Sequence, residues 1–127
     1  MKVIIAGSRD LDYPEIVREA IDKSGWRFQI EEVVHGGCRG VDMCAGAWAA
    51  EEKIPVRVFP AEWGKHGLRA GPIRNAQMAD YADALIAVWD GVSKGTKNMI
   101  AEANARMLKV YVYRYPSDYL AHPQQSV

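Results

Sequence analysis

Five short apolar runs alternate with segments of helical periodicity along this chain. The runs span residues 2–6, 32–35, 55–59, 84–89 and 109–113. Runs of this length predict β-strands, and the longer periodic segments between them predict helices. Such alternation is typical of βαβ units, which build a parallel sheet with helices on both faces. The sequence therefore predicts an α/β fold with a doubly wound, mainly parallel five-stranded sheet.

The helical segments carry start and stop signals. Asp12 is the expected N-cap of the first helix, with Pro14 in the first turn and Glu15 three residues after the cap. Gly25 is expected to end this helix. Three further helices are predicted at residues 41–53, 72–81 and 95–107.

Residues 60–72 follow neither the strand period nor the helix period. They are predicted to form a loop that is long enough to suspect of function. With 127 residues, the chain fits one domain with a substantial core. We assign residues 1–114 to this domain and residues 115–127 to a C-terminal surface extension.

Charge and composition exclude several kinds of protein. Sixteen basic and sixteen acidic side chains cancel, so no overall field draws the chain to nucleic acid or to anionic lipid. The N-terminal apolar run is too short for a signal peptide or a membrane span. Cys38 and Cys44 form neither a Cys-x-x-Cys pair nor a disulfide framework, which favours a cytoplasmic location. His35, His66 and His122 are scattered, so no metal site is expected.

Three glycine-containing loops follow three of the predicted strands. Residues 7–9 follow the first strand, residues 36–42 the second and residues 91–96 the fourth. If the strands are ordered 3-2-1-4-5, the winding of the sheet reverses between the first and fourth strands. Ligands of such sheets bind outside the carboxyl ends of the strands at this reversal. The three loops are therefore predicted to form a single ligand crevice.

The loop at residues 36–42 is the strongest anion-binding signal. A glycine pair ends a strand and a helix begins at once, which would present unpaired N–H groups and the positive end of a helix dipole. Arg39 beside it favours a phosphate or a carboxylate as guest. The simpler alternative is a tight turn in which Asp42 caps the helix. The spacing matches neither a Walker loop nor Gly-x-Gly-x-x-Gly, so ATP hydrolysis and NAD binding lack sequence support.

Basic and amide side chains flank the predicted crevice. Arg9 follows the first strand and is either an anion clamp or a solvated arginine paired with Asp10. Arg74 and Asn75 stand at a predicted helix start, where they are either ligand donors or part of an exposed first turn.

Hydroxyl, aromatic and thiol side chains complete the candidate set. Ser93 and Thr96 stand at the mouth of the fourth helix and either contact a phosphate or cap the helix. Trp63, in the long loop, is the candidate for stacking on a base. Cys38 precedes a helix, but without a paired histidine or a second nearby cysteine we do not expect it to act as a nucleophile.

Four segments, taken together, resemble the signatures of a known family. They are residues 3–9 (VIIAGSR), 35–42 (HGGCRGVD), 70–78 (AGPIRNAQM) and 89–96 (WDGVSKGT). In order and spacing they resemble the YspA-like branch of the SLOG superfamily over about residues 2–113. That superfamily includes the DNA-processing protein Smf/DprA and the Lonely Guy phosphoribohydrolases. The resemblance implies a single Rossmann-like domain that binds nucleotides, nucleotide derivatives or, in the DNA-processing branch, single-stranded DNA.

One departure from the Lonely Guy pattern bears on catalysis. In those enzymes a glutamate three residues after the Gly-Thr pair serves N-glycosidic cleavage. Here that position is Met99, which can neither transfer a proton nor stabilise a cation by charge. Asp90 and Glu102 are the remaining catalytic candidates, but neither stands at the family position.

The leading hypothesis is a binder or sensor of a nucleotide or nucleotide-derived small molecule, with no further cofactor evident. The first alternative is a nucleotide N-glycosidase, and the second is a single-stranded DNA-binding protein, which the neutral charge disfavours. No membrane partner is expected. The sequence leaves open the identity of the nucleotide, the pathway, catalysis and self-association into a homo-oligomer. The residues expected to bind the ligand are Gly7, Ser8, Arg9, Gly36, Gly37, Cys38, Arg39, Gly40, Asp42, Trp63, Arg74, Asn75, Asp90, Ser93, Gly95 and Thr96.

Overall fold

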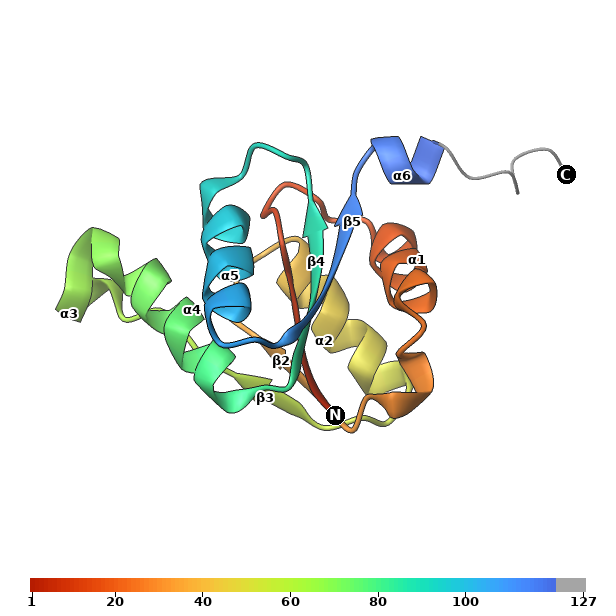
Figure 1. Cartoon of the computed structure of the whole chain (residues 1–127), viewed down its shortest axis with the longest axis horizontal. Coiled ribbons are helices and arrows are strands. Elements are labelled where there is room, and N and C mark those ends of the chain that lie inside the picture. Colours follow the sequence, from red (N-terminus) through yellow and green to blue (C-terminus); the bar gives the residue numbers. More distant parts are fainter. Residues whose placement is uncertain (121–127) are drawn as a thin grey trace, which may run out of the picture.

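The computed structural model describes residues 1–120 and shows a five-stranded sheet between two layers of helices (Figure 1). All strand pairings are parallel, and the order is β3-β2-β1-β4-β5. The predicted α/β class, the doubly wound parallel sheet and the strand order are therefore confirmed. The strands are β1 (Lys2–Gly7), β2 (Glu32–His35), β3 (Val56–Val58), β4 (Ala84–Trp89) and β5 (Lys109–Arg114).

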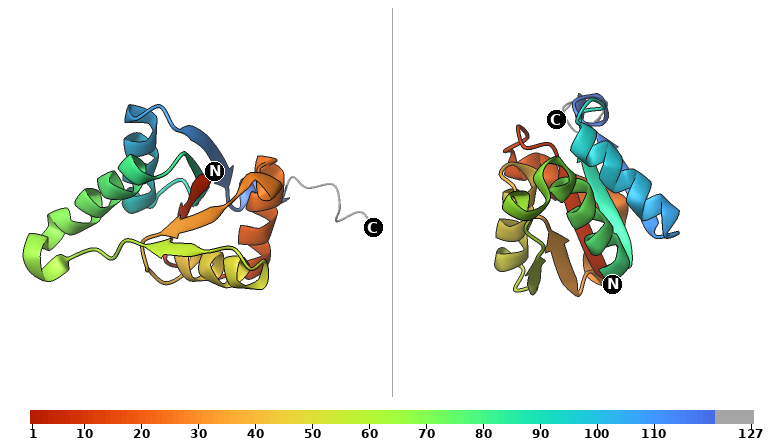
Figure 2. Two further views of the ribbon diagram at one scale, coloured as in Figure 1. Left: turned by 90° about the horizontal axis from the view of Figure 1, so that it is seen from below. Right: turned by 90° about the vertical axis from the view of Figure 1, so that its left-hand side faces the viewer.

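The two faces of the sheet are covered by different helix pairs (Figure 2). Alternate residues of a strand point to opposite faces, so Val3 and Ile5 of β1 pack with the first pair while Ile4 packs with the second. Every one of these side chains is fully buried. The first pair is α1 (Pro14–Ser24) and α2 (Val41–Glu51), and the second is α4 (Ala70–Tyr81) and α5 (Lys94–Ala105).

Two local predictions about helices were wrong. The N-cap of α1 is Tyr13, without a side-chain cap bond, while the Asp12 carboxylate accepts a hydrogen bond from the Cys44 thiol at 3.4 Å. A contact distant in sequence thus replaces the local cap. The predicted loop at 60–72 is largely helical, because α4 begins at Ala70 rather than at residue 72. The other short elements are the 3₁₀ turns η1 (Arg27–Gln29) and η2 (Gly67–Arg69) and the helix α3 (Trp63–His66).

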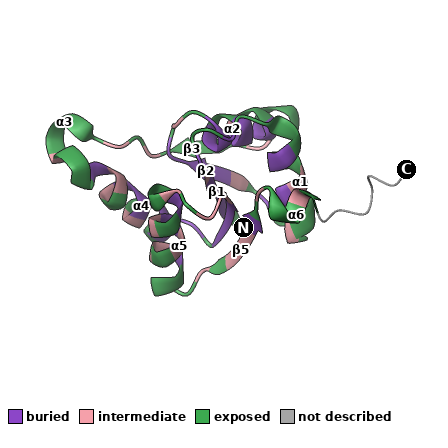
Figure 3. Cartoon of the chain, turned by 90° about the horizontal axis from the view of Figure 1, so that it is seen from above, coloured by how far each residue is buried: buried purple, intermediate pink, exposed green. Residues whose placement is uncertain are grey.

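The short helices at 63–69 escape a search for periodicity because none of their side chains is buried. They extend away from the sheet at the end of α4, and their surface is almost entirely exposed (Figure 3). A segment that buries no face has no reason to repeat apolar residues at the helical period. Gly25, in contrast, ends α1 as predicted, with a left-handed φ of 77°.

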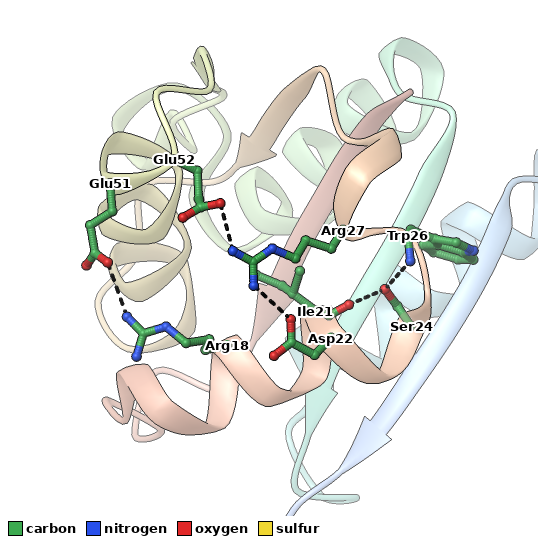
Figure 4. A network of polar contacts seen from close by, with 8 residues as sticks. All are labelled: Arg18, Ile21, Asp22, Ser24, Trp26, Arg27, Glu51 and Glu52. Carbon is green, nitrogen blue, oxygen red and sulfur yellow. Dashed lines mark hydrogen bonds and ion pairs between the residues drawn. The ribbon is translucent and has the colours of Figure 1, made fainter.

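An exposed polar network joins α1 to α2 (Figure 4). Arg18 contacts Glu51 at 3.3 Å, and Arg27 bridges Asp22 at 3.3 Å and Glu52 at 2.9 Å. Solvent-exposed pairs of this kind each contribute between about 0 and 1 kcal/mol. They therefore orient two neighbouring helices on one face of the sheet rather than supply most of the stability.

After β5 the chain continues into α6 (Ser117–Leu120). Tyr115 and Tyr119 are partly buried against the core beneath α1, and their ring centroids lie 6.0 Å apart. Residues 121–127 of the predicted extension, including His122, lie outside the described residues. Within residues 1–120, no helix has both the length and the apolar character needed to cross a membrane.

Candidate functional site

A cavity of about 540 Å³ opens at the carboxyl ends of β1 and β4. These two central strands lead to α1 on one face and α5 on the other, so the cavity lies where the winding of the sheet reverses. The predicted crevice and this cavity coincide. Its walls are formed by Ala6, Gly7, Ser8, Arg9, Asp10, Cys38, Asp42, Trp63, Gly71, Pro72, Arg74, Asn75, Met78, Asp90, Val92, Ser93, Lys94, Gly95, Thr96, Asn98 and Met99.

The structure brings most of the sequence-predicted binding residues to this cavity, but not all. Those that line it are Gly7, Ser8, Arg9, Cys38, Asp42, Trp63, Arg74, Asn75, Asp90, Ser93, Gly95 and Thr96. Those that do not are Gly36, Gly37, Arg39 and Gly40. The loop that gave the strongest anion signal in the sequence therefore supplies only its cysteine and its aspartate to the wall.

The glycine turn after β2 is occupied by the protein itself. The Asp42 Oδ2 atom accepts hydrogen bonds from the backbone N–H groups of Gly36 at 3.0 Å and Cys38 at 3.2 Å. The N–H of Gly37 donates to Nδ1 of His35 at 2.9 Å. Three of the donors predicted to hold a phosphate thus already have acceptors. A self-contained turn fits this loop better than a phosphate cradle, but Asp42 does not cap α2, whose N-cap is Gly40 without a side-chain cap bond.

Asp42 is a buried carboxylate in the cavity wall. The residue is only 5% exposed, and burial raises the pKa of its carboxyl group to about 6. The hydrogen bonds from Cys38 and Gly36, and the charges of Arg74 and Arg9, act in the opposite direction. Burial also lowers the pKa of His35, and the charge of Arg74 lowers it further, which favours neutral imidazole.

Arg74 and Asn75 form a buried network that joins three loops. Arg74 Nη1 donates to the carbonyl oxygen of Gly36 at 2.7 Å, and its Nε donates to Asn75 Oδ1 at 3.0 Å. Asn75 Nδ2 donates in turn to Asn98 Oδ1 at 2.9 Å and to the carbonyl oxygen of Gly95 at 3.3 Å. Because α4 begins at Ala70, this network belongs to the second turn of the helix, and its residues are buried rather than part of an exposed first turn. It places a buried guanidinium between the glycine turn and the start of α5.

The start of α5 remains open to the cavity. The Asp90 Oδ1 atom accepts the N–H groups of Val92 and Ser93 at 2.8 and 2.7 Å, which lowers the pKa of this carboxyl group. Among the described residues, no side chain caps α5. The first-turn N–H groups of a helix have no partner within it, and a Cβ placed on Gly95 would meet no atom within 4 Å. Ser93 and Thr96 share a hydroxyl–hydroxyl contact of 3.2 Å instead of capping the helix.

The Ser8 hydroxyl is a buried polar group whose described interaction is with the Asp90 carboxyl group. The residue is 4% exposed, lines the cavity, and its Oγ atom makes no hydrogen bond within residues 1–120. Its approach to Asp90 contributes to the lowered pKa of that carboxyl group. Most buried polar groups are hydrogen-bonded, so an unpaired one in a cavity wall is expected to meet water or a ligand.

Close backbone packing explains two of the predicted glycines. A Cβ on Gly7 would stand 2.3 Å from the carbonyl oxygen of Val88. A Cβ on Gly40 would stand 2.4 Å from the carbonyl oxygen of Arg9, and Gly40 has a φ of 78°. Gly40 therefore lets α2 begin directly against the loop after β1, although it does not itself line the cavity.

At the mouth of the cavity, Arg9 and Trp63 lie together. The guanidinium carbon of Arg9 is 5.9 Å from the centroid of the Trp63 ring, and Trp63 is 48% exposed. The arginine thus packs with the ring, while Asp10 pairs with the exposed Arg39 at 3.4 Å. Of the two alternatives for Arg9, the pair with Asp10 is not found within residues 1–120, and Arg39 does not line the cavity although its partner Asp10 does.

The two catalytic candidates have different positions. Asp90 lines the cavity, whereas Glu102 does not and instead pairs with Arg106 at 2.6 Å. Met99 is 1% exposed and closes the apolar end of the cavity with Met78. Sequence reasoning missed this apolar end because its residues follow the same helical period as core residues. It also omitted Lys94 and Asn98, although their positions in the first turns of α5 were a usable signal.

Comparison with known proteins gives two matches. Residues 1–66 match the model of the YspA, cpYpsA-related SLOG family. Over 77 residues the chain is 40% identical to the Gene 61 protein of Mycobacterium phage D29, a match that covers 56% of this chain and 62% of that protein. The matched part is thus less than two thirds of the phage protein. Because the family match covers more than half of the chain, the protein belongs to the YspA, cpYpsA-related SLOG family.

Proposed function

We propose that this domain binds a phosphate-bearing, nucleotide-derived small molecule in the cavity between the ends of β1 and β4. One observation carries the proposal: the uncapped start of α5 and the Ser8 hydroxyl, which makes no hydrogen bond within residues 1–120, face the same cavity. A helix N-terminus attracts anions through its free N–H groups and its dipole. The volume of about 540 Å³ lies within the range of small-molecule sites, about 300–1,000 Å³.

The charges of the wall support an anionic ligand. Arg74 is 8% exposed and forms no ion pair in the part of the chain that the structure describes. Lys94 adds a second positive charge where α5 begins. A phosphate at this helix start would therefore meet backbone donors with two cations nearby. Trp63 and Arg9 at the mouth offer a face on which a base can stack.

Substitution of Ser8 by alanine separates binding from folding. By distance and angle the Ser8 hydroxyl makes no hydrogen bond within residues 1–120, and Ser8→Ala removes only its interaction with the Asp90 carboxyl group, so a small change in unfolding temperature is expected. If the hydroxyl contacts the ligand, Ser8→Ala weakens binding by roughly tenfold, the value of about one lost hydrogen bond. Ser117→Ala, at an exposed serine of α6, is the matched control.

The measurement is a thermal-shift and calorimetric panel of nucleoside mono- and diphosphates, ADP-ribose and cyclic nucleotides. Stabilisation of the wild-type protein by at least one of them, with loss in Ser8→Ala and not in Ser117→Ala, supports the proposal. The absence of any stabilising compound, or equal binding by all three proteins, contradicts it. Chromatography of the same samples detects release of a base, which would instead establish N-glycosidic cleavage.

A further inference from the structure

The two loops predicted to hold a phosphate differ in whether their backbone N–H groups already have a carboxylate acceptor. The N-terminal end of α5 has no side-chain cap within residues 1–120. The glycine turn after β2 instead holds the Asp42 carboxylate, which accepts the N–H groups of Gly36 and Cys38 at 3.0 and 3.2 Å. This carboxylate therefore takes two of the N–H groups that a phosphate bound in the glycine turn would use.

The occupied end and the open end of the cavity belong to one continuous wall. Arg74 binds the carbonyl oxygen of Gly36 at 2.7 Å and the side chain of Asn75, which reaches the carbonyl oxygen of Gly95 at 3.3 Å. Cys38 and Gly95 both line the cavity. A ligand anchored at α5 would therefore share its cavity with Asp42, and a second phosphate would bring further negative charge into that cavity.

A second phosphate is opposed by the Asp42 charge at one end of this wall. Its cationic residues Arg9, Arg74 and Lys94 are balanced by the acidic residues Asp10, Asp42 and Asp90. Among the described residues, Arg74 Nη2 contacts the Cys38 sulfur at 3.8 Å, and the guanidinium forms no direct ion pair with a carboxylate. Removal of the Asp42 charge would leave Arg74 as the dominant charge at that end.

We propose that the Asp42 carboxylate restricts the cavity to ligands with one phosphate and excludes ligands with a diphosphate. This specificity role rests on the binding function proposed above. Asp42 acts by filling the donors of the glycine turn and by repelling an incoming negative charge. The ligand class that fits is a phosphate monoester held at α5.

Protonation of Asp42 should relax the restriction. The charged or titratable groups around this carboxylate are Arg9 from the loop after β1, His35 from β2, Cys38 from its own turn and Arg74 from α4. Burial raises the pKa of Asp42 to about 6, so its charge is reduced at pH 5.5 and present at pH 7.5. The diphosphate-to-monophosphate affinity ratio should therefore rise as the pH falls. The terminal phosphates of the two compound sets titrate alike, so the ratio reports on the protein.

Isothermal titration calorimetry with the 5′-mono- and diphosphates of adenosine, guanosine, cytidine and uridine tests the restriction. At pH 7.5 the wild-type protein is expected to bind a monophosphate at least about tenfold more tightly than the matching diphosphate, since close like charges cost at least this much. Asp42→Asn, which keeps an acceptor for the N–H groups, is expected to reduce this preference about tenfold. Asp10→Asn removes a wall charge whose side chain is 91% exposed and already paired with Arg39, so solvent screening should leave the ratio within about twofold.

The outcomes separate this inference from the proposed function. Monophosphate binding with an unchanged ratio in Asp42→Asn overturns the role of Asp42 and leaves the binding function intact. The same holds if Asp10→Asn shifts the ratio equally, because bulk charge would then explain it. Absence of binding by every protein overturns both proposals. If Asp42→Asn does not fold, the wild-type ratio at pH 5.5 and 7.5 decides: a rise at low pH supports the role, and a constant ratio refutes it.

Discussion

Asp42→Asn should make the protein more stable at neutral pH, although it changes a buried, hydrogen-bonded side chain. The carboxylate accepts two backbone N–H groups through Oδ2, and its Oδ1 atom makes no hydrogen bond within the described residues. Asparagine can keep the acceptor in place and turn its NH₂ group toward the cavity, where water is available. The substitution therefore preserves the turn and removes only the buried charge.

The magnitude follows from the pKa of Asp42. The value rises from 3.8 to about 6 on folding because burial disfavours the charged form. Each pH unit between these values is worth about 1.4 kcal/mol, so ionisation of Asp42 costs the folded state about 3 kcal/mol. Between pH 4 and 6 the unfolded chain has lost this proton while the folded protein keeps it, so stability falls as the pH rises. Above about pH 6 the folded state has lost the whole stabilisation that protonated Asp42 provides at low pH.

Urea unfolding of both proteins from pH 4 to pH 7.5 measures this effect. The difference in unfolding free energy at pH 4 gives the cost of the amide itself, because Asp42 is then largely protonated in the folded state. Relative to that value, Asp42→Asn should gain about 2–3 kcal/mol by pH 7.5. Titration of other groups, including His35, cancels in the difference. A difference that stays constant with pH, or that changes in the opposite direction, would refute the reasoning.

Two further predictions concern backbone geometry and the cavity mouth. Gly40→Ala should lower the free energy of unfolding, measured in urea, by about 3 kcal/mol. The reason is that its Cβ would stand 2.4 Å from the Arg9 carbonyl oxygen, at a backbone φ of 78°. Gly64→Ala, whose Cβ would meet no atom within 4 Å, is the control, and equal stability of the two variants would contradict the prediction. Trp63→Ala should weaken nucleotide binding, measured by calorimetry, by about 1–3 kcal/mol. Because Trp63 is largely exposed, the same substitution should change the free energy of unfolding by less than about 0.5 kcal/mol. An unaltered affinity would exclude stacking of a base on this ring.

The fold could be predicted because its determinants are local and repeated. The apolar run at 84–89 is buried on both faces as β4, and Pro14 and Gly25 mark the first helix close to its observed limits. The strand order could be predicted because right-handed crossovers leave few alternatives for a chain of βα units. The segment at 63–69 could not be predicted, since its short exposed helices bury no face and leave no periodic pattern.

The candidate site could be located from the sequence, but the partners of its residues could not. Residues that follow the ends of β1 and β4 meet because parallel strands end at the same edge of the sheet. Whether Asp42 faces a ligand or the N–H groups of its own turn depends on the path of the chain between residues 36 and 42. Likewise, Asp12, which precedes α1, accepts a hydrogen bond from Cys44 of α2, a contact that no local sequence rule predicts.

Unfavourable polar features concentrate around the cavity. Asp42 is buried with its charge opposed by burial; within residues 1–120 the Ser8 hydroxyl makes no hydrogen bond, and Arg74 is buried without an ion pair. A buried unpaired hydroxyl alone costs about 1–3 kcal/mol. The other buried unpaired atom, Nε of Arg27, belongs to a guanidinium whose remaining nitrogens form ion pairs (Figure 4). The stability of the fold does not require these unfavourable groups to lie in one place. A ligand that completes their contacts would explain why they do. This concentration, more than the glycine loops themselves, supports the proposal that the cavity binds a ligand.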